Sequence, residues 1–555
     1  MPAQPLSSLE IAQNATLRPI GDIAEAAGLL PSEVDLYGRY KAKIDLGVIE
    51  RLADRPDAKL VCVTAITPTK AGEGKTTTSV SLTQGLGAIG KRPTLCLREA
   101  SLGPVFGIKG GAAGAGHAQV VPMEDMNLHF TGDIHAIGAA NNLLAAMLEA
   151  SILHGNPLGI DPLTVSWRRC LDINDRALRD IVVGLGGKAN GYVRQTGFDI
   201  TAASEVMGIV AVSRDLADLR ARLGAITVGS TYEGEPVTAE QLRAAGSMTV
   251  LLKEALKPNL VQTLEGQPAF VHCGPFANIA HGNSSLTADR VALKLGDYVI
   301  TESGFGSDMG MEKFFDIVCR AGGLRPSAVV LVATVKALKH HGDNPDGGPE
   351  AMEAGAANMI RHLGIIRTFG LNAVVAVNRF PADSDDEVEL VKKIALASGA
   401  FASEICEGVA HGGEGATVLA HAVVAAADEP SEFTFAYDVE QTLEEKITAI
   451  ATKVYGADGT ELLPLARRKA ADLAAKGLDK VPVCMAKTHL SLSHDPALRN
   501  APTGFTVTVR DLRPYTGAGW VVALCGDMQT MPGLGAKPAA FDVDIDENGK
   551  TIGLF

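Results

Sequence analysis

The central part of the chain is built from short, unbroken apolar runs separated by longer polar segments. Continuous runs rich in β-branched residues are typical of parallel strands that are buried on both faces. We therefore predict strands at residues 59–66, 93–97, 269–273, 298–301, 328–335 and 373–378. The segment TTTSVSLTQGLGAIG after the first strand has the composition of a helix. Together these segments predict an α/β protein with a doubly wound, mostly parallel sheet, like that of P-loop NTPases.

The two ends of the chain have a different pattern. Residues 5–58 are polar and helix-like. Toward the C-terminus we predict charged helices at 439–455 and 462–476, and short strands at 506–509 and 521–524. These changes of pattern predict two smaller appended α/β domains. The predicted division is a P-loop domain of residues 1–362, a second domain of 363–455 that includes the tail 541–555, and a small domain of 456–540.

Most of the predicted strands are followed by loops that combine glycine with charged or amide side chains. In chain order these loops are TPTKAGEGKT, REASLGP, GPFANIAHGNS, ESGFGSDMG, KALKHHGD and NRFPADSD. In an open α/β sheet, ligands bind at the carboxyl ends of the strands. We therefore expect one site that is assembled from several of these loops.

Composition narrows the class of protein. The 555 residues suffice for roughly two to four domains, and 50 Lys and Arg against 64 Asp and Glu give a net charge of −14. This charge argues against a general nucleic-acid or membrane binder, so an anionic ligand needs a local basic pocket.

No apolar run approaches the ~20 residues that span a bilayer, and the N-terminus has no targeting pattern, which predicts a cytoplasmic protein. The eight scattered cysteines, without a C-x-x-C pair, are expected to be buried reduced thiols.

A phosphate-binding loop is the strongest chemical signal in the sequence. Gly72, Gly74, Lys75 and Thr76 follow the first predicted strand and precede a helix, which is the context that such a loop requires. Its glycines let backbone N–H groups face phosphate oxygens, its lysine reaches the β- and γ-phosphates, and its threonine hydroxyl ligates Mg²⁺. Thr69 stands at the first glycine position of the usual motif, so the match is imperfect. The alternative is an ordinary glycine-rich turn.

Other candidate groups lie after later strands. Arg98 directly follows the second predicted strand, where it either neutralises charge on a transferring phosphoryl group or forms a surface salt bridge. The glycine-rich run 109–116 either approaches a ligand closely or is a flexible loop. Residues 127–135 combine amide, imidazole, hydroxyl and carboxylate groups, but their H-x₅-H spacing is weak evidence for zinc. Phe380, beside Arg379, either forms an aromatic wall with an anion anchor or belongs to the core.

Taken together, these segments resemble the formate–tetrahydrofolate ligases, also called 10-formyltetrahydrofolate synthetases, from about residue 30 to the C-terminus. The stretches that carry the resemblance are TKAGEGKTT (69–77), LREASLGPVFGIKGG (97–111), VPMEDMNLHFTGDIHA (121–136), FDITAASEVM (198–207), ATVKALK (333–339), NRFP (378–381), YGADG (455–459), PVCMAK (482–487) and MPGL (531–534). The resemblance implies a monofunctional, homotetrameric cytosolic enzyme. Its substrates would be formate, MgATP and tetrahydrofolate with or without a polyglutamate tail, its intermediate formyl phosphate, and its activator a monovalent cation, K⁺ or NH₄⁺.

The resemblance also implies the roles of individual residues. Lys75 and Arg98 match the residues that hold the acyl phosphate, and they are expected to be catalytic. ATP contacts are implied for Thr69, Lys70, Ala71, Gly72, Glu73, Gly74, Lys75, Thr76 and Thr77, with Thr76 on the magnesium ion. Substrate contacts are implied for Arg98, Asn127, His129, Asp133, Phe380, Gly412 and Gly413, with the Phe380 ring against the pterin.

The chain departs from the family pattern at a few positions. Val409, in the segment VAHGG, stands where the family has Trp, so one aromatic face of the pterin pocket is missing. The other departures are Lys70 for Pro, Ala100 for Pro, Ala115 for Gly, His117 for Tyr and Lys336 for Arg. These departures are expected to affect the affinity for folate more than they affect the chemical step.

A different class of function remains as the alternative. In a P-loop ATPase switch, nucleotide controls binding to a macromolecular partner and no small molecule is formylated. ATP turnover by a ligase depends on formate, whereas turnover by a switch is indifferent to formate and responds to the partner.

Overall fold

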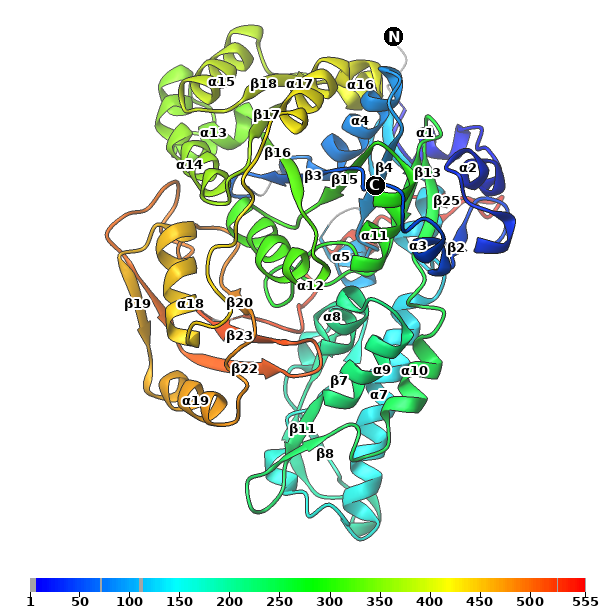
Figure 1. The fold of residues 1–555 in the computed structure, drawn as a ribbon, viewed down its shortest axis with the longest axis vertical. Helices are drawn as coiled ribbons and strands as arrows, with labels where there is room; N and C mark the ends of the chain where they lie inside the picture. The colour runs from blue at the N-terminus through cyan, green and yellow to red at the C-terminus, as the bar shows by residue number, and fades with distance from the viewer. Residues whose placement is uncertain (1–5, 70–71, 109–112, 527, 555) are drawn as a thin grey trace.

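A large mixed, mostly parallel sheet forms the centre of the computed structural model, which describes residues 6–69, 72–108, 113–526 and 528–554 (Figure 1). Its main path runs, in spatial order, through β1 (Val34–Leu36), β2 (Ala42–Ile44), β13 (Asn259–Thr263), β14 (Pro268–Val271), β4 (Pro93–Leu97), β15 (Tyr298–Glu302), β3 (Lys59–Ala65), β16 (Pro326–Ala333), β17 (Ala373–Asn378) and β18 (Ala402–Cys406). Two short strands, β5 (Gly114–Ala115) and β6 (Ala118–Val121), join beside β13. The six strands predicted in the centre of the chain are all confirmed, as is the α/β class.

Strand direction divides the sheet. Every pairing from β14 to β18 is parallel, whereas β1, β2, β6 and β13 pair antiparallel. The prediction of residues 5–58 as purely helical was incomplete. That segment contains α1 (Ser8–Asn14), α2 (Ile20–Ala26) and α3 (Gly47–Arg51), but also strands β1 and β2.

Helices cover both faces of the sheet, because both faces of its parallel strands are apolar. Along β3, Leu60 and Cys62 belong to one core, whereas Val61 and Val63 belong to another. The first core also takes residues of α11 (Leu286–Leu295) and α14 (Pro349–Thr368), and the second takes residues of α4 (Lys75–Ala88) and α17 (Thr417–Asp428). Continuous apolar runs in the sequence therefore correspond to strands packed between two helical layers.

The remaining elements form two smaller regions beside the sheet. One, below the sheet in Figure 1, contains α7 (Asp133–Leu153), α8 (Glu205–Val212), α9 (Leu216–Ala225), α10 (Ala245–Leu252), β7 (Arg169–Leu171), β8 (Ile181–Val183), β9 (Arg194–Thr196), β10 (Phe198–Ile200), β11 (Thr227–Ser230) and β12 (Pro236–Thr238). The other contains α18 (Leu443–Ala449), α19 (Pro464–Ala475), β19 (Gly459–Leu462), β20 (Val483–Ala486), β21 (Thr506–Val509), β22 (Asp511–Tyr515) and β23 (Trp520–Leu524). The predicted C-terminal helices and strands are thus confirmed, with the first helix continuing as a π-helical segment, Ile450–Tyr455.

The remaining α-helices and the last two strands connect these layers or lie at their edges. They are α5 (Leu102–Gly107), α6 (Met123–Asn127), α12 (Arg320–Gly322), α13 (Val335–His341), α15 (Asp385–Ala397), α16 (Gly408–His411), β24 (Asp544–Ile545) and β25 (Thr551–Ile552). β17 and β18 belong to the same sheet as β3. The boundaries predicted for the three domains stay predictions.

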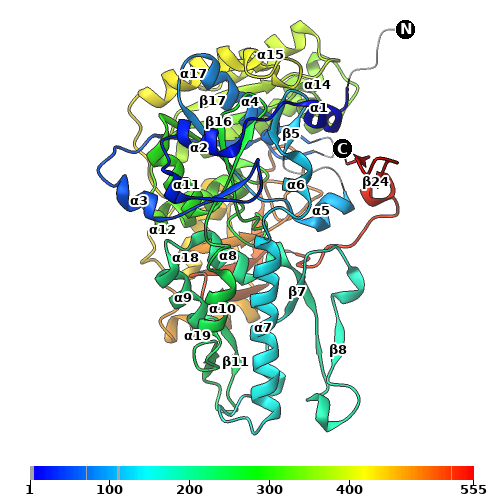
Figure 2. The same ribbon diagram turned by 90° about the vertical axis from the view of Figure 1, so that its right-hand side faces the viewer.

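The C-terminal hairpin β24–β25 lies beside α5 and α6 (Figure 2). Gln13 Nε2 donates to the Thr551 carbonyl oxygen at 3.0 Å, and the Thr551 hydroxyl donates to Glu124 Oε2 at 2.6 Å. Leu554 is fully buried. The tail is therefore part of the packed structure and holds α1 and α6 together.

Helix α7 is long and apolar. It has 21 residues with a window of mean hydropathy 1.4, so by length and composition alone it is able to cross a membrane. Run length did not predict this helix, because Asn141, Asn142 and Glu149 interrupt its apolar residues. Its Ile137 and Leu144 side chains pack in a core with α8, α9 and α10, and 39% of the apolar window is buried.

Candidate active site

The phosphate-binding loop connects the carboxyl end of β3 to the first turn of α4. Gly72 and Gly74 have φ values of +74° and +75°, the left-handed region that favours glycine. A Cβ atom at Gly74 would overlap the side-chain amide of Asn378, so only glycine fits there. Lys75 is the first residue of α4, and both it and Thr76 are half-buried. The loop thus presents a lysine, a hydroxyl and a helix N-terminus at one place, which suits phosphate.

Glu73 holds this loop in shape. Its side chain is only 2% exposed, and its Oε1 atom accepts a hydrogen bond from the Thr69 N–H at 2.7 Å. Its carbonyl oxygen accepts a hydrogen bond from Asn378 Nδ2 at 3.1 Å. The predicted contacts of Lys70 and Ala71 lie outside the described residues. Within the loop, the Glu73 carboxylate therefore faces backbone rather than solvent, an arrangement that supports the loop.

Arg98 lies beside the phosphate-binding loop because of strand order. β15 pairs in parallel with both β3 and β4, so the loops after these three strands are neighbours. Arg98 follows β4, and its Nη1 donates to the Pro275 carbonyl oxygen at 3.4 Å. A Cβ at Gly304, in the loop after β15, would lie 3.1 Å from Arg98 Nη2. The backbone of that loop therefore packs directly against the guanidinium.

Burial determines the electrostatics around Arg98. Burial lowers the pKa of the Arg98 guanidinium, and the nearby Glu302 carboxylate opposes this shift. Arginine nevertheless stays protonated in proteins. A fixed positive charge in a poorly solvated place attracts an anion more strongly than the same charge in water does. Arg98 is accordingly a candidate for the local positive charge that an anionic ligand of an acidic chain needs.

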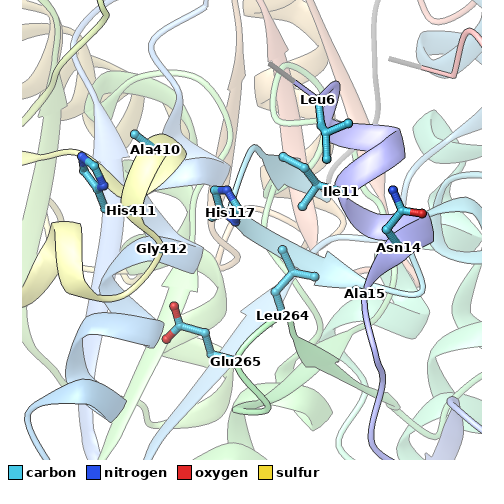
Figure 3. Close-up of a pocket in the computed structure, with 10 residues that line it drawn as sticks. All are labelled: Leu6, Ile11, Asn14, Ala15, His117, Leu264, Glu265, Ala410, His411 and Gly412. Carbon is cyan, nitrogen blue, oxygen red and sulfur yellow. The ribbon is translucent and has the colours of Figure 1, made fainter. Parts of the chain in front are cut away.

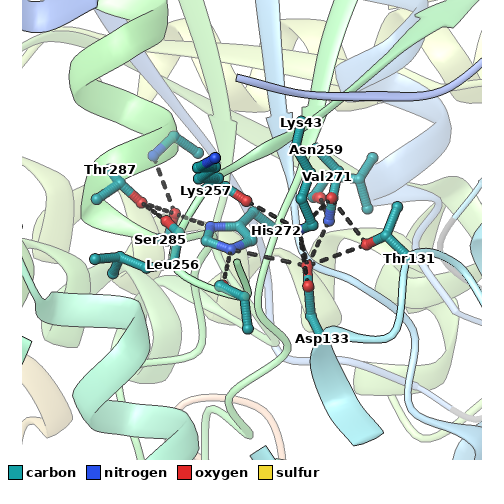
Figure 4. Close-up of polar contacts among 12 residues, drawn as sticks. Lys43, Thr131, Asp133, Leu256, Lys257, Asn259, Val271, His272, Ser285 and Thr287 are labelled. Carbon is teal, nitrogen blue, oxygen red and sulfur yellow. Dashed lines mark hydrogen bonds and ion pairs between the residues drawn. The ribbon is translucent and has the colours of Figure 1, made fainter. Parts of the chain in front are cut away.

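The segment 127–135 does not form one cluster. Asn127 is buried at the end of α6, His129 is exposed, and Asp133 is buried at the start of α7. The Asp133 carboxylate oxygens lie 2.8 and 3.0 Å from Lys43 Nζ, and its Oδ2 accepts a hydrogen bond from Asn259 Nδ2 at 2.7 Å (Figure 4). Asp133 thus has internal partners, and the predicted substrate contacts of this segment remain predictions.

The network around Asp133 extends to a buried histidine. His272 Nε2 lies 3.9 Å from Asp133 Oδ2, and its two nitrogens contact the Ser285 hydroxyl at 2.6 Å and the Ala255 carbonyl at 2.7 Å (Figure 4). Burial lowers the pKa of His272 to about 4. Its imidazole is therefore neutral at pH 7, and Lys43 is the positive charge that balances Asp133.

We predict that Lys43→Met destabilises the protein by about 3 kcal/mol, because the Asp133 carboxylate would remain buried without a cation. Both members of the pair are at most 2% exposed. Urea denaturation measures the change. The matched control is Lys59→Met, which removes a lysine of the exposed pair with Asp428, 46% and 61% exposed, and should cost less than about 1 kcal/mol. Equal effects of the two substitutions would contradict the prediction.

Phe380 lies two strands away from the phosphate-binding loop, at the carboxyl end of β17. Its ring is 36% exposed, so it is available as a wall. The neighbouring Arg379 is less available as an anion anchor, because its guanidinium lies 2.6 Å from Asp385 and 3.4 Å from Glu407. Asn378 connects this loop to Glu73. The candidate pterin wall and the phosphate-binding loop therefore belong to one edge of the sheet.

Gly412 and Gly413 follow α16 and lie away from the phosphate-binding loop, beside Gln84 in the later part of α4 and Glu265 in the turn before β14. Gly413 N–H donates to Glu265 Oε1 at 2.7 Å, and a Cβ at Gly412, where φ is +57°, would overlap that carboxylate. Beside them is a surface pocket of about 480 Å³ (Figure 3). It is lined by Leu6, Ile11, Asn14, Ala15, His117, Leu264, Glu265, Ala410, His411 and Gly412. Phe380 is not among these residues, so the aromatic wall and this pocket are separate features.

Comparison with known proteins gives these loops a common context. The sequence model of the family described as formate–tetrahydrofolate ligase matches residues 6–555. The protein of that name from Desulforamulus reducens is 58% identical over 99% of both chains. That from Cutibacterium acnes is 56% identical over 99% of this chain and all of its own. The chain belongs to the formate–tetrahydrofolate ligase family. The resemblance predicted from motifs is confirmed along nearly the whole length.

Membership in this family gives the chain formate–tetrahydrofolate ligase activity and, with it, the use of ATP. A ligase that activates a carboxylate with ATP needs a phosphate site and an acyl phosphate site in contact. The neighbouring loops after β3, β15 and β4 are the candidates for this pair. The eight cysteines of this ligase are free and buried, as predicted, and do not suggest thiol chemistry.

Two groups of the ligase near Arg98 were missed by the sequence analysis. Glu99 is 5% exposed, and burial and the Asp133 carboxylate raise its pKa. His281 is fully buried, and burial with the nearby Arg98 and Lys313 charges lowers its pKa to about 3. Glu99 lies in the quoted loop REASLGP, so position after a strand was an available signal. His281 lies in the quoted loop GPFANIAHGNS and carries the same signal, but its proximity to Arg98 and Lys313 depends on the fold.

Proposed function

We propose that the protein makes 10-formyltetrahydrofolate, ADP and phosphate from formate, tetrahydrofolate and ATP in the cytoplasm, through formyl phosphate, at a P-loop NTPase-like site. The observation that supports this most is the parallel pairing of β15 with both β3 and β4, because the loops that carry Lys75 and Arg98 then follow strands of the same edge, with one strand between them. The wider proposal includes a homotetramer, the predicted three-domain division, polyglutamylated folate as a substrate, and activation by K⁺ or NH₄⁺.

The chemistry explains why a phosphate site is needed. Formate is a poor acyl donor because hydroxide would have to leave. When a formate oxygen attacks the γ-phosphorus, an O–P bond forms and ADP leaves with the electrons of the broken P–O bond. Lys75 and Arg98 stabilise the negative charge that spreads over the phosphoryl oxygens. Formyl phosphate then has phosphate as its leaving group, and tetrahydrofolate N10 can displace it.

Mg²⁺ fits this site through few protein ligands. Among the described residues there is no group of three or more His, Cys, Asp or Glu side chains arranged to hold a metal ion. Mg²⁺ bound with ATP needs no such cage, since phosphate oxygens and water complete its coordination. The half-buried Thr76 hydroxyl is the proposed protein ligand. The bound ion would supply positive charge to the β- and γ-phosphate oxygens.

Phe380, Gly412 and Gly413 are the proposed folate contacts, with Asn127, His129 and Asp133 as further candidates. We predict that Phe380→Ala raises the KM for tetrahydrofolate about tenfold and leaves the KM for ATP unchanged, because a stacked ring contributes roughly 1–3 kcal/mol. Val409 is 41% exposed, and Val409→Trp should lower the folate KM by adding a second wall. Steady-state kinetics with each substrate varied in turn provides the measurement.

The control is Phe401→Ala. Phe401 is 40% exposed and precedes β18, at the opposite end of that strand from the site. Its substitution should leave both KM values unchanged. If the folate KM of Phe380→Ala is within about twofold of the parent value, the pterin does not stack on Phe380 and binds elsewhere.

The decisive test of the function is product formation by the purified protein. Formate, tetrahydrofolate and MgATP should yield 10-formyltetrahydrofolate, and omission of formate should stop ATP turnover. Turnover that ignores formate and rises with a macromolecular partner would instead establish the ATPase switch.

A further inference from the structure

A segment from the C-terminal region contacts the loop after β15, next to the phosphate-binding loop. It begins at Lys487, directly after β20, and Lys487 Nζ lies 2.7 Å from Asp308 Oδ2. Both side chains are at most 3% exposed. Asp308 follows the loop after β15, the strand between β3 and β4. This buried ion pair fixes the segment against the edge of the sheet where the candidate site lies.

His489, two residues further on, stacks on Phe305. The two ring centroids are 4.5 Å apart and the ring planes differ by 16°. Phe305 lies in the loop after β15, next to Gly304, which packs against Arg98. Its φ of +59° is unusual for a side chain of this size and defines where its ring points. The His489 imidazole is thereby held above the loop that separates Lys75 from Arg98.

Three charged groups act on this imidazole. Lys487 from its own segment and Lys75 from α4 lower the pKa of His489, as burial does, and Asp308 opposes them. The ring is therefore neutral at pH 7, with one N–H donor. In the parts of the chain that the structure describes, neither ring nitrogen of His489 makes a hydrogen bond. A half-buried donor without a protein acceptor is available to a ligand.

We propose that His489 contacts the phosphoryl group during its transfer: its imidazole N–H donates a hydrogen bond to a phosphoryl oxygen held between Lys75 and Arg98. This inference rests on the proposed function, because it places the γ-phosphate at those two residues. His489 keeps its proton throughout, while the formate O–P bond forms and the bond to ADP breaks. Negative charge is spread over the phosphoryl oxygens in that transition state, so a fixed neutral donor stabilises it.

Two substitutions at one position test this role. His489→Ala removes the donor and should lower kcat/KM for ATP about tenfold or more, the effect of losing a hydrogen bond to a charged group. His489→Gln keeps an N–H donor and should recover at least part of that loss. The KM for tetrahydrofolate should not change in either variant. Leu490→Ala is the control, since the adjacent Leu490 is 44% exposed and should retain the parent kinetics.

Binding measurements separate this inference from the proposed function. A non-hydrolysable ATP analogue is titrated into the parent, Lys75→Ala and His489→Ala by calorimetry, with thermal unfolding of each. Unchanged analogue affinity in Lys75→Ala would show that the nucleotide site itself is misplaced. Weakened affinity in Lys75→Ala, together with kcat/KM within about twofold of the parent in His489→Ala, would overturn only the role of His489. Equal losses in the Gln and Ala variants, or failure of both to fold, would also overturn it, since either would indicate a structural role.

Discussion

Lys75→Ala is expected to reduce ATP-dependent formylation by about 10³-fold or more while leaving the unfolding transition unchanged. Lys75 is half-buried at the first turn of α4, the position from which the proposed contact with the phosphates is made. Removing it takes away a positive charge from the place where the phosphoryl group gains negative charge. The measurements are kcat for 10-formyltetrahydrofolate formation and thermal unfolding of the same preparation.

Lys59→Ala is the matched control for this substitution. Lys59 begins β3, the strand whose other end leads to Lys75, and it is 46% exposed. Both variants remove a lysine next to the same strand, but only one lies at the site. If Lys75→Ala retains activity within about tenfold of the parent, the phosphate-binding loop has no part in the mechanism.

Arg98→Ala is expected to lower kcat by about 10³-fold and to change the KM for ATP much less. The Arg98 charge is held at the end of β4 by packing against Gly304 and by the Pro275 carbonyl. A group that acts where charge develops affects the chemical step more than nucleotide binding. Arg98→Lys keeps the positive charge but lacks the planar guanidinium, so its kcat should lie between those of the parent and of Arg98→Ala. Pre-steady-state formation of ADP separates chemistry from product release.

Arg92→Ala provides the comparison for Arg98. Arg92 precedes β4 at its opposite end, is 62% exposed and pairs with Asp297 at 2.6 Å. Its loss should leave kcat unchanged. An Arg98→Ala enzyme with the parent kcat and a raised KM for ATP would assign Arg98 to nucleotide binding instead.

The sequence predicted β3, β4, β14, β15, β16 and β17 because each is a continuous apolar run, but not the parallel edge strand β18, where Ser403 and Glu404 interrupt the apolar pattern. It missed β2 and β13, since these short strands carry buried polar groups such as Lys43 and Asn259. The reason for burying these polar side chains is visible only in the folded structure, where Lys43 forms an ion pair with Asp133. A polar residue in a short strand has no periodic signal that identifies its partner.

The candidate site was likewise predictable from the sequence only where its residues follow a local pattern. Lys75 and the glycines before it follow a local pattern, because a phosphate-binding loop takes its backbone shape and its lysine from a few consecutive residues. The neighbours of Arg98 and the stacking of His489 on Phe305 depend on strand order and on a distant segment. Residues 127–135 are close in sequence but differ in burial, with Asn127 and Asp133 buried and His129 exposed, and their predicted substrate contacts stay predictions.

The packed C-terminal tail has a consequence for synthesis. Thr551 bonds to Gln13 and Glu124, and Leu554 enters the core, so contacts of the first helices depend on the last residues of the chain. A ribosome synthesises the N-terminal residues first, so α1 and α6 gain these contacts only after residues 551–554 have also been synthesised. During most of translation the two helices therefore lack the partners that connect them in the folded enzyme.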